Sequence, residues 1–541
     1  MATQTRGKSM DIVKKPAKKA AKKPVKKPVE KPEEEPKLDL DEELLEIEEK
    51  AFKKPMLKDK KKAKLHMVSI VFAALATIIN VVFLYRMLSA QVLPAKYAYP
   101  LLAVVVIMTL FYIFKALRKK THKAVLVVLN ILAVIISAAL LFATVKINEV
   151  FSFLSKNMDN KQYAVYDVIV SKSSPMNSID DAKNKEIITY NELVKDVSDD
   201  KLKSTVSEKI PGSSLKFLDE IEDVFGSIVN NNEKVVIVND GTYSAYIENM
   251  PEYAGKVKII GTIELENEEK IVEATKGDIT NTPFVIYISG IDTRTGTMPT
   301  RSLSDVNITA VINPNTKHVQ LISIPRDSYV QLHGTSGLKD KLTHAGSKGG
   351  VKLSQATLED LYGIKYDRYI RVNFNFVKKL VDAVGGITIN SDVDYTFTTK
   401  HENCTIKPGL NNINGKCAIG FSRERYAYKN GDRHRGENQL QVIEKVFAKA
   451  TNGSTILSKY SQILESLNGT FDSNIAMEDI TSLVRMQLDD MAKWKIESFS
   501  VTGKGAMSET YSYPRQKLYV MHIDAASLET AKKKIQSVLA E

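Results

Sequence analysis

Arginine is concentrated in one short stretch of the C-terminal half of this chain. The stretch FSRERYAYKNGDRHRGENQ contains Arg423, Arg425, Arg433 and Arg435 within 13 residues. A planar guanidinium can donate two parallel hydrogen bonds to phosphate oxygens, and it keeps its charge when partly desolvated. The stretch therefore suggests a pyrophosphate site. A solvated basic surface is the interpretation that the stretch alone favours, because arginine runs are common and no Walker or Rossmann glycine pattern accompanies these arginines.

Charged residues also stand at the ends of predicted strands upstream of this stretch. Asp292 directly follows VIYISGI, Asp305 begins SDVNITAV, and Arg326 and Asp327 follow VQLISIP. Open α/β folds place their sites at strand ends. Two carboxylates can hold a hard divalent cation such as Mg²⁺ against a pyrophosphate.

The segments that must position these residues alternate between strand-like and helix-like patterns from about residue 283 onwards. Turn signals separate them, with Asn313-Pro314-Asn315 between two strands and Gly385-Gly386 closing a helix. This order predicts an α/β domain. The expected strands are FVIYISGI, VNITAVIN, VQLISIP, YIRVNF and GITIN, and the expected helices are LSQATLEDLYG, FNFVKKLVDAVGG and NQLQVIEKVFAKAT.

Residues 150–275 also read as α/β, in a segment without a catalytic constellation. The apolar stretches YAVYDVIVS, KVVIVND and KVKIIGTIEL predict strands, and SSLKFLDEIEDVFGSIV predicts a helix. The stretch SPMNSIDDAKNKEI is similar to the strand–turn–helix entry of a solute-binding-type domain. We expect an accessory domain here, with ligand binding as the second interpretation.

Three apolar runs, Met67–Tyr85, Tyr97–Phe114 and Ala124–Val145, precede these domains. Each is about as long as the ~20 residues that a membrane-spanning helix needs. The loop KALRKKTHK between the second and third runs carries five basic residues, whereas the loop from Arg86 to Lys96 carries only those two. The positive-inside rule then predicts a cytoplasmic N-terminus and extracellular C-terminal domains.

The net charge of +12 is concentrated in the N-terminal tail. Residues 1–66 hold 20 Lys and Arg against 13 Asp and Glu. The Lys/Pro/Ala tract of residues 1–36 predicts disorder, and the stretch LDLDEELLEIEEKAFKK predicts a short amphipathic segment that folds only transiently. Basic residues beside a membrane set orientation and contact anionic lipid, which we favour over a nucleic-acid-binding arm.

The two cysteines and one histidine leave alternatives open. Cys404 and Cys417 are the only cysteines, and they form either one local disulfide, if this part lies outside the cell, or two unpaired core residues. His344 in KLTHAG has no partner that the sequence identifies, and a structural role is favoured for it.

Seven blocks resemble one known family. YISGID, SDVNI, SIPRDSYV, KLTHAG, VDAVGGITI, NGKCAIGFSRER and GDRHRGENQ occur in order between residues 284 and 440, and they resemble the LytR–CpsA–Psr (LCP) family. The three spans and the intervening domain resemble its CpsA-like, capsule-assembly branch. The sequence patterns and the resemblance together predict four parts: 1–66, a cytoplasmic tail, which lies outside the resemblance; 67–145, three transmembrane helices; 146–280, an extracellular α/β accessory domain; 281–541, an α/β, αβα sandwich-like LCP phosphotransferase domain.

The family resemblance implies an enzyme of the outer membrane face in Gram-positive cells. Such an enzyme transfers a glycopolymer (capsule, teichoic acid or another secondary wall polymer) from a polyprenyl-pyrophosphate carrier to peptidoglycan and leaves a phosphodiester. The implied partners are the lipid-linked donor, peptidoglycan, the membrane and wall- or capsule-assembly proteins, without nucleic acid. The second hypothesis is a non-catalytic membrane regulator or scaffold that binds polyprenyl-linked glycan. The exported position of the charged residues argues against a transcription factor.

The resemblance also assigns roles to individual residues. Asp292 and Asp305 would hold Mg²⁺ (or Mn²⁺), and Asp327 would either orient Arg326 or help to deprotonate the attacking hydroxyl. The family usually has Arg two residues before the second carboxylate, where this chain has Leu303. We expect Arg301 to fill that vacancy, with a missing phosphate contact as the alternative. The residues implied to bind the pyrophosphate are Arg301, Arg326, Arg423, Arg425 and Arg435, supported by Gln439.

Overall fold

A computed structural model gives the fold of this chain. It describes residues 40–90, 93–158, 163–192, 195–229, 231–267, 274–275, 277–291, 298–398, 403–428, 431–452, 463 and 470–541. The Lys/Pro-rich tract of residues 1–36, for which we expect disorder, lies outside this described part. The first compact unit, Met1–Met67, is described only from residue 40.

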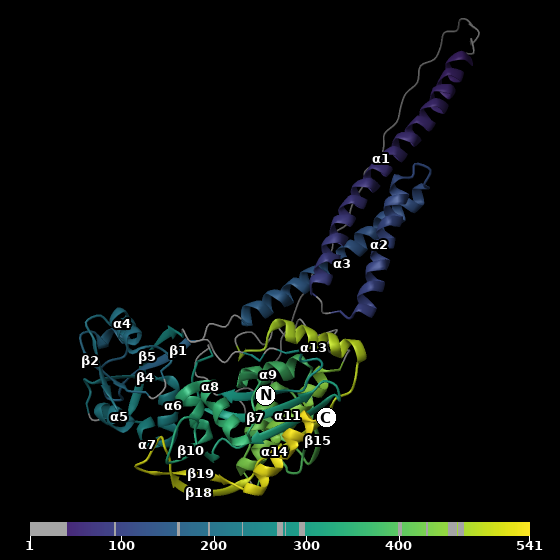
Figure 1. Ribbon diagram of the computed structural model, residues 1–541. Coiled ribbons are helices and arrows are strands. Elements are labelled where there is room, and N and C mark those ends of the chain that lie inside the picture. Colours follow the sequence, from purple (N-terminus) through teal and green to yellow (C-terminus); the bar gives the residue numbers. More distant parts are fainter. Residues whose placement is uncertain are drawn as a thin grey trace, which may run out of the picture. The chain divides into compact units, whose positions relative to one another are not determined.

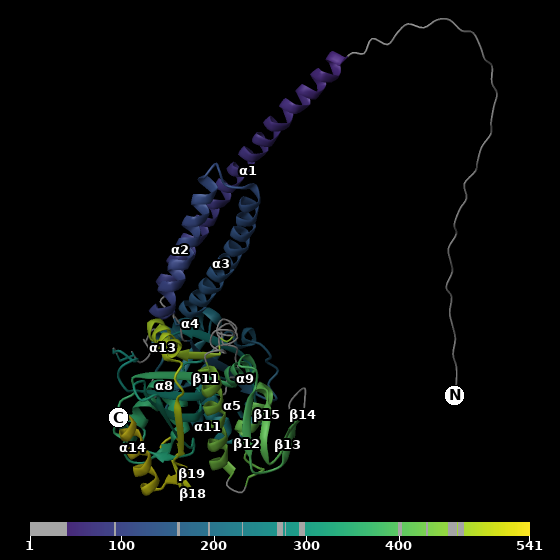
Figure 2. The same cartoon turned by 90° about the vertical axis from the view of Figure 1, so that its right-hand side faces the viewer.

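Three apolar helices form the N-terminal part of the second unit, Val68–Glu541. Their lengths and composition suit a membrane span over Lys60–Ala90, Ala95–Leu117 and Lys123–Asn148, which include the three predicted runs. The helices lie side by side in both views (Figures 1 and 2). Polar side chains pair within the bundle, because Asn80 donates to Thr109 (2.7 Å), as expected where lipid offers no partner. The helices are α1 (Leu40–Ala90), α2 (Ala95–Leu117) and α3 (Lys123–Met158).

A five-stranded mixed sheet follows, in the order β3-β2-β4-β1-β5. Strands β2, β3 and β4 are parallel, and β1 runs antiparallel to both of its neighbours. Helices α4, α5 and α6 pack beside this sheet (Figure 1). The elements are β1 (Tyr163–Ser171), a 3₁₀ turn (Ile179–Ala182), β2 (Glu186–Tyr190), α4 (Asp199–Lys209), β3 (Ser214–Leu218), α5 (Ile221–Val229), β4 (Val235–Asn239), α6 (Asp240–Asn249), α7 (Pro251–Ala254) and β5 (Val257–Glu266).

The C-terminal part is built on a six-stranded sheet in the order β16-β11-β6-β7-β8-β17. Its strands alternate in side-chain direction, so that each face buries its own set of residues. On one face Tyr287 packs in a cluster with Leu358 of α8 and Ile535 of α14. On the other face Ile286 packs with Leu440 of α11. The sheet is thus the middle layer of an αβα sandwich, as predicted.

The elements of this part begin with β6 (Phe284–Ile291), β7 (Ser304–Asn313), β8 (His318–Ile324), β9 (Tyr329–Val330), β10 (Asp340–Lys341), α8 (Leu342–Tyr362), β11 (Arg368–Asn373) and α9 (Phe374–Ala383). Two antiparallel sheets of two strands each follow beside α9 (Figure 2). One pairs β12 (Ile387–Ser391) with β15 (Gly409–Ile413), and the other pairs β13 (Tyr395–Thr398) with β14 (Asn403–Ile406). The chain ends with α10 (Gly415–Arg423), α11 (Gly431–Ala450), β16 (Phe471–Ser473), α13 (Met477–Asp490), β17 (Lys495–Ser500), β18 (Gly503–Glu509), β19 (Lys517–Ile523) and α14 (Ala525–Leu539).

Two expectations are corrected by these elements, and one is confirmed. The stretch SSLKFLDEIEDVFGSIV is not one helix: residues 214–218 pair in parallel with β2, and only Ile221–Val229 is helical. Pairing with a neighbouring strand outweighs local helix propensity there. The predicted strand GITIN is confirmed as β12, which pairs with β15 in a two-stranded sheet of its own. The acidic segment expected to fold only transiently is helical from Leu40, in one helix with the first span.

The two cysteines are bonded to each other. Cys404 in β14 and Cys417 in α10 form a disulfide, with their Cα atoms 5.7 Å apart. Of the two alternatives left open by the sequence, the structure therefore has the local cross-link. It ties a hairpin to the helix whose last residue is Arg423.

Candidate active site

Strand register gathers the predicted site residues at one edge of the six-stranded sheet. The last residue of β6, Ile291, pairs in parallel with Asn373, the last residue of β11. Ile291 also lies opposite Ser304, the first residue of β7. The parallel strands β8 and β17 end at the same level, since Ser323 pairs with Ser500. Side chains that follow these strand ends therefore share one edge.

Asp305 and Arg326 meet at this edge. Ile291 pairs with Ser304 and Gly290 pairs with Val306, so Asp305 is the extra residue of a β-bulge. A bulge redirects the side chain that it carries. Arg326 follows β8 by two residues, and its Nη1 donates to Oδ1 of Asp305. Arg326 is only 9% exposed, so this guanidinium is largely withdrawn from water.

A second carboxylate reaches Arg326 from the five-stranded sheet. Nη2 of Arg326 donates to Oε1 of Glu248, which lies near the end of α6. Burial alone would raise the pKa of Glu248, but attraction to Arg326 outweighs burial and lowers that pKa below its ordinary value. Glu248 could not be identified from the sequence, because it follows no strand and belongs to none of the seven blocks.

The arginine-rich stretch forms the end of α10 and the start of α11. The guanidinium of Arg423 lies over the ring of Phe374, 4.3 Å from its centroid, and Phe374 directly follows β11. Gln439 of α11 donates to the carbonyl oxygen of Ser422 (3.3 Å), which fixes α11 against the end of α10. A Cβ atom built on Gly436 would lie 3.4 Å from Oγ of Ser323, so this turn of α11 crosses the end of β8.

The structure places Arg423 beside the end of β11, and Arg326 and the α11 turn of Arg435 beside the end of β8. Arg435 is half-buried on α11, next to the glycine that lies against β8. Arg425 is exposed and donates to the hydroxyl of Tyr426 (2.8 Å). Asp327 is close to Lys341, with 3.3 Å between Oδ1 and Nζ. Asp292 lies outside the described residues.

Arg301 does not have the surroundings expected of a phosphate ligand. Its Nη1 donates to Oε2 of Glu192 (2.6 Å), and its Nε donates to Oδ1 of Asp196 (2.9 Å). Burial would lower the pKa of Arg301, but these two carboxylates raise it. The side chain is 1% exposed. This arrangement does not support the expectation that Arg301 grips the pyrophosphate, because both of its carboxylate partners belong to the part of the chain that carries the five-stranded sheet, whereas Arg326 pairs with Asp305 at the strand edge.

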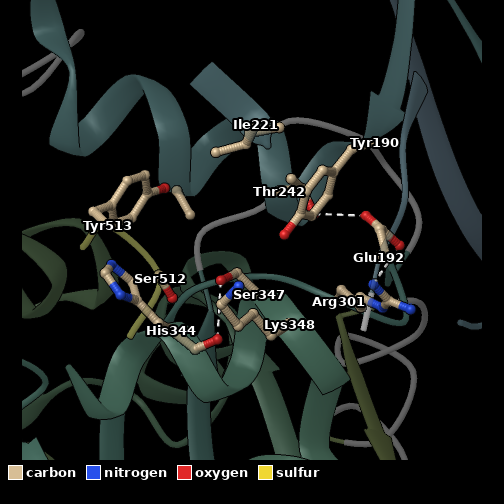
Figure 3. A pocket seen from close by; sticks show the side chains of 11 residues that line it. Tyr190, Glu192, Ile221, Thr242, Arg301, His344, Ser347, Lys348, Ser512 and Tyr513 are labelled. Atoms are coloured by element: carbon tan, nitrogen blue, oxygen red, sulfur yellow. Dashed lines mark hydrogen bonds and ion pairs between the residues drawn. The ribbon is translucent and has the colours of Figure 1, made fainter. Parts of the chain in front are cut away.

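His344 is a structural histidine with partners on both ring nitrogens. Nδ1 lies 2.7 Å from Oδ1 of Asp340, and Nε2 lies 3.0 Å from Nδ2 of Asn249. Figure 3 shows this histidine on one wall of a cavity between the two sheets, with the Arg301–Glu192 pair on another. The cavity is therefore lined by both α/β parts of the chain rather than by the arginines of α10 and α11.

The acids at the sheet edge suit a hard divalent cation in chemical type. Asp305 offers carboxylate oxygens, which Mg²⁺ prefers, and it stands at the strand end that the sequence predicts. Among the described residues no three His, Cys, Asp or Glu side chains form a ready cluster. Asp305 is the one predicted metal ligand within the described part of the chain.

Comparison with known proteins gives a consistent set of relatives. A model of the LytR_cpsA_psr family matches residues 253–534. The polyisoprenyl-teichoic acid–peptidoglycan teichoic acid transferase TagU of Enterococcus faecalis is 33% identical over 234 residues, which cover 43% of this chain and 74% of that protein. Biofilm regulatory protein A of Streptococcus mutans is 33% identical over 242 residues, or 43% of this chain and 59% of that protein.

Among solved structures, the crystal structure of TagV of Bacillus subtilis is similar. It has 29% sequence identity and a TM-score of 0.42, and the match covers 48% of this chain and 99% of that one.

Proposed function

This chain belongs to the LytR_cpsA_psr family, and from that premise we propose that it is a membrane-anchored phosphotransferase. It transfers a glycopolymer from a polyprenyl-pyrophosphate carrier to a hydroxyl of peptidoglycan. The single observation that carries the proposal is the meeting of Arg326 and Asp305 at the strand edge to which α10 and α11 bring their arginines.

The reaction is a substitution at the phosphorus that bears the glycan. The acceptor oxygen forms a bond to this phosphorus, and the bond from phosphorus to the bridging pyrophosphate oxygen breaks. The glycan is left in a phosphodiester, and polyprenyl phosphate leaves with the electron pair. Such a transfer depends mainly on positioning and on charge neutralisation, which arginines provide without covalent catalysis.

Individual residues take separate parts in this scheme. Arg326, Arg423, Arg425 and Arg435 bind the non-bridging oxygens, and Gln439 holds the start of α11 against the end of α10 through Ser422. Asp327 accepts the proton of the acceptor hydroxyl. Its position directly after Arg326, at the end of β8, supports this role.

Asp292 and Asp305 would hold Mg²⁺ or Mn²⁺, and the bound ion would neutralise charge on the pyrophosphate. The carboxylate of Asp305 already pairs with one cationic group, the guanidinium of Arg326. This pairing supports the proposal that the carboxylate can also attract a divalent cation.

The membrane part keeps the enzyme beside its donor. We place the N-terminus in the cytoplasm and the C-terminal domains outside, on the basis of the basic loop between the second and third spans. The polyprenyl chain stays in the bilayer, so tethering limits the distance between the lipid-linked phosphate and the site. The transferred polymer is a teichoic acid, in keeping with the name of the Enterococcus faecalis relative, or another wall polymer of the capsule type.

A non-catalytic regulator is the second candidate, and one observation favours it. Leu303 stands where the family usually has arginine, and Arg301 is neutralised by Glu192 and Asp196. One phosphate contact is thus missing from the usual set. A protein that binds a lipid-linked glycan without transferring it would tolerate that loss.

Transfer by the full chain in lipid vesicles separates the two candidates. The donor is a polyprenyl-pyrophosphate-linked glycan, the acceptor is peptidoglycan, and the readouts are the glycan–phosphate–peptidoglycan product and released polyprenyl phosphate. We expect both products from the unaltered chain and neither from Arg326→Ala. Binding of the donor without either product would favour the regulator.

A further inference from the structure

Helix α6 of the five-stranded sheet contacts the candidate site through one of its faces. Thr242, Ala245 and Glu248 are spaced three residues apart, so they lie along one side of the helix. Thr242 and Ala245 line the cavity between the two sheets, and Figure 3 shows Thr242 there. Glu248 accepts a hydrogen bond from Arg326, and the neighbouring Asn249 lies 3.0 Å from His344. The accessory part of the chain thus reaches an arginine of the proposed phosphate site directly.

The segment that leads to Asp305 is fixed on the same part of the chain. Arg301 is held by Glu192 and Asp196, and Oγ1 of Thr300 also donates to Asp196 (2.8 Å). The backbone is fixed too, since the amide of Thr300 donates to the carbonyl of Tyr163 (3.1 Å).

Close packing leaves little freedom at this contact. A Cβ atom added to Gly241 would lie 2.9 Å from Cβ of Arg301, so the start of α6 and this segment are packed backbone against backbone. The five-stranded sheet therefore holds both members of the Asp305–Arg326 pair: the strand that carries Asp305 through residues 300–301, and Arg326 through Glu248.

From this arrangement we propose that Glu248 is a positioning residue for Arg326, so that the phosphate site is completed by the accessory domain. The inference rests on the proposed function, in which Arg326 binds the pyrophosphate. Two carboxylates, Asp305 on β7 and Glu248 on α6, accept hydrogen bonds from opposite terminal nitrogens of one guanidinium. They fix both the plane of the fork and its position along the sheet edge.

The geometry favours a positioning role over a blocking role. Without Glu248, the Nη2 end of a guanidinium that is 9% exposed loses its counter-charge. The guanidinium of Arg326 can then rotate toward Asp305 and donate two parallel hydrogen bonds to its carboxylate, because arginine and carboxylate favour that geometry. Both groups would then be withdrawn from the substrate. A blocking carboxylate would have the opposite effect, since its removal would free Arg326 for the phosphate.

The test compares the full chain in lipid vesicles with Glu248→Gln, Glu248→Ala and a matched control. Glu252→Gln is the control, because Glu252 is an exposed glutamate in the same domain, on α7. Transfer rates give kcat and KM, and binding of a polyprenyl pyrophosphate without glycan gives Kd. A displaced catalytic group can cost on the order of 100-fold in rate. We expect about that loss in kcat for Glu248→Ala and about 10-fold for Glu248→Gln, whose amide oxygen still accepts a hydrogen bond.

Each outcome decides for or against the inference. Partial recovery in Glu248→Gln relative to Glu248→Ala, with thermal unfolding and the control unchanged, supports positioning. Equal rates in all variants, or faster transfer and tighter binding in Glu248→Ala, overturn it. If Glu248→Ala unfolds at a lower temperature, the glutamine variant decides alone, because it keeps the size of the side chain.

Arg326→Ala separates this inference from the proposed function. If Arg326→Ala transfers and binds as the unaltered chain does, the proposed phosphate site is wrong. If Arg326→Ala is inactive while both Glu248 variants are fully active, only the positioning role is wrong.

Discussion

Arg371 and Asp472 form an ion pair that is almost completely buried, with both side chains 2% exposed. Nε of Arg371 lies 3.0 Å from both carboxylate oxygens. The same guanidinium donates to the carbonyl oxygens of Pro299 and Thr300, each at 2.8 Å. One arginine of β11 therefore joins the edge strand β16 to the segment that leads to Asp305.

Removing the acid of this pair should destabilise the protein strongly. We expect Asp472→Ala to lower the free energy of unfolding by about 3–5 kcal/mol, because a buried guanidinium would be left without its counter-charge. The thermal unfolding temperature of the full chain in detergent measures the effect. Asp180→Asn is the control, since the carboxylate of Asp180 is 76% exposed in its pair with Lys183 and should change stability little. Equal shifts for both variants would contradict the prediction.

Loss of a phosphate-binding arginine should reduce transfer far more than stability. Arg435→Ala and Arg423→Ala each remove a cation from the strand edge, and removal of one preorganised donor to a developing charge costs on the order of 100- to 1,000-fold in kcat. The product assay in lipid vesicles gives the rate. Lys517→Ala, which removes an exposed cation from β19, should transfer at the normal rate. Full activity in both arginine variants would disprove the site.

Donor and metal together should protect the protein from heat. Ligand that binds only the folded state raises stability by RT ln(1 + [L]/Kd), so a polyprenyl pyrophosphate should raise the unfolding temperature. The rise should be larger with Mg²⁺ than with a chelator, and Asp305→Asn should abolish the difference. A rise of the same size with and without Mg²⁺ would argue against a metal at the carboxylates.

Because of the contact between Asp340 and His344, the free energy of unfolding should decrease as the pH is lowered. Burial would raise the pKa of Asp340, but His344 and the hydroxyl of Ser512 outweigh burial and lower it. A carboxylate with a lowered folded pKa stabilises the protein above its unfolded pKa of about 3.9, and this contribution is lost as the pH falls through the folded value. Unfolding temperatures between pH 7 and pH 3 should therefore fall less steeply in Asp340→Asn. Parallel curves for the two proteins would contradict this account.

The cross-link between Cys404 and Cys417 should stabilise the part of the chain that presents Arg423. It closes a loop with a sequence separation of 13, for which chain entropy gives roughly 3 kcal/mol. A reductant should lower the unfolding temperature of the unaltered chain and leave the Cys404→Ser/Cys417→Ser variant unchanged. An equal response of both proteins to reductant would show that the cross-link adds no stability.

Much of the six-stranded sheet and its edge could be predicted from sequence because the signals are local. An apolar run of strand length, followed by a charged residue, places Asp305 and Arg326 at strand ends before any contact is known. The pairing of the two strands then brings these residues together. The αβα layering follows from the same alternation of apolar side chains.

The contacts of Arg301 and Glu248 could not be predicted, because they join residues far apart in the sequence. Arg326 and Glu248 are separated by 78 positions, and Arg301 and Glu192 by 109. The sequence around Arg326 or Arg301 does not indicate which carboxylate pairs with it, since a glutamate near the end of a helix is normally a solvated side chain. Only the packing of α6 against the second sheet decides which carboxylate meets which guanidinium.

Arg326 and Arg301 both pair with carboxylates from the part of the chain that carries the five-stranded sheet. This pairing has a practical consequence for experiments on shorter fragments of the protein. A fragment that begins near residue 281 would retain both guanidinium groups and lose Glu192, Asp196 and Glu248, which now neutralise them. The surroundings of these two arginines would be more basic in the fragment than in the intact protein. Phosphate or nucleotide retained by such a fragment would therefore be a poor guide to the natural ligand.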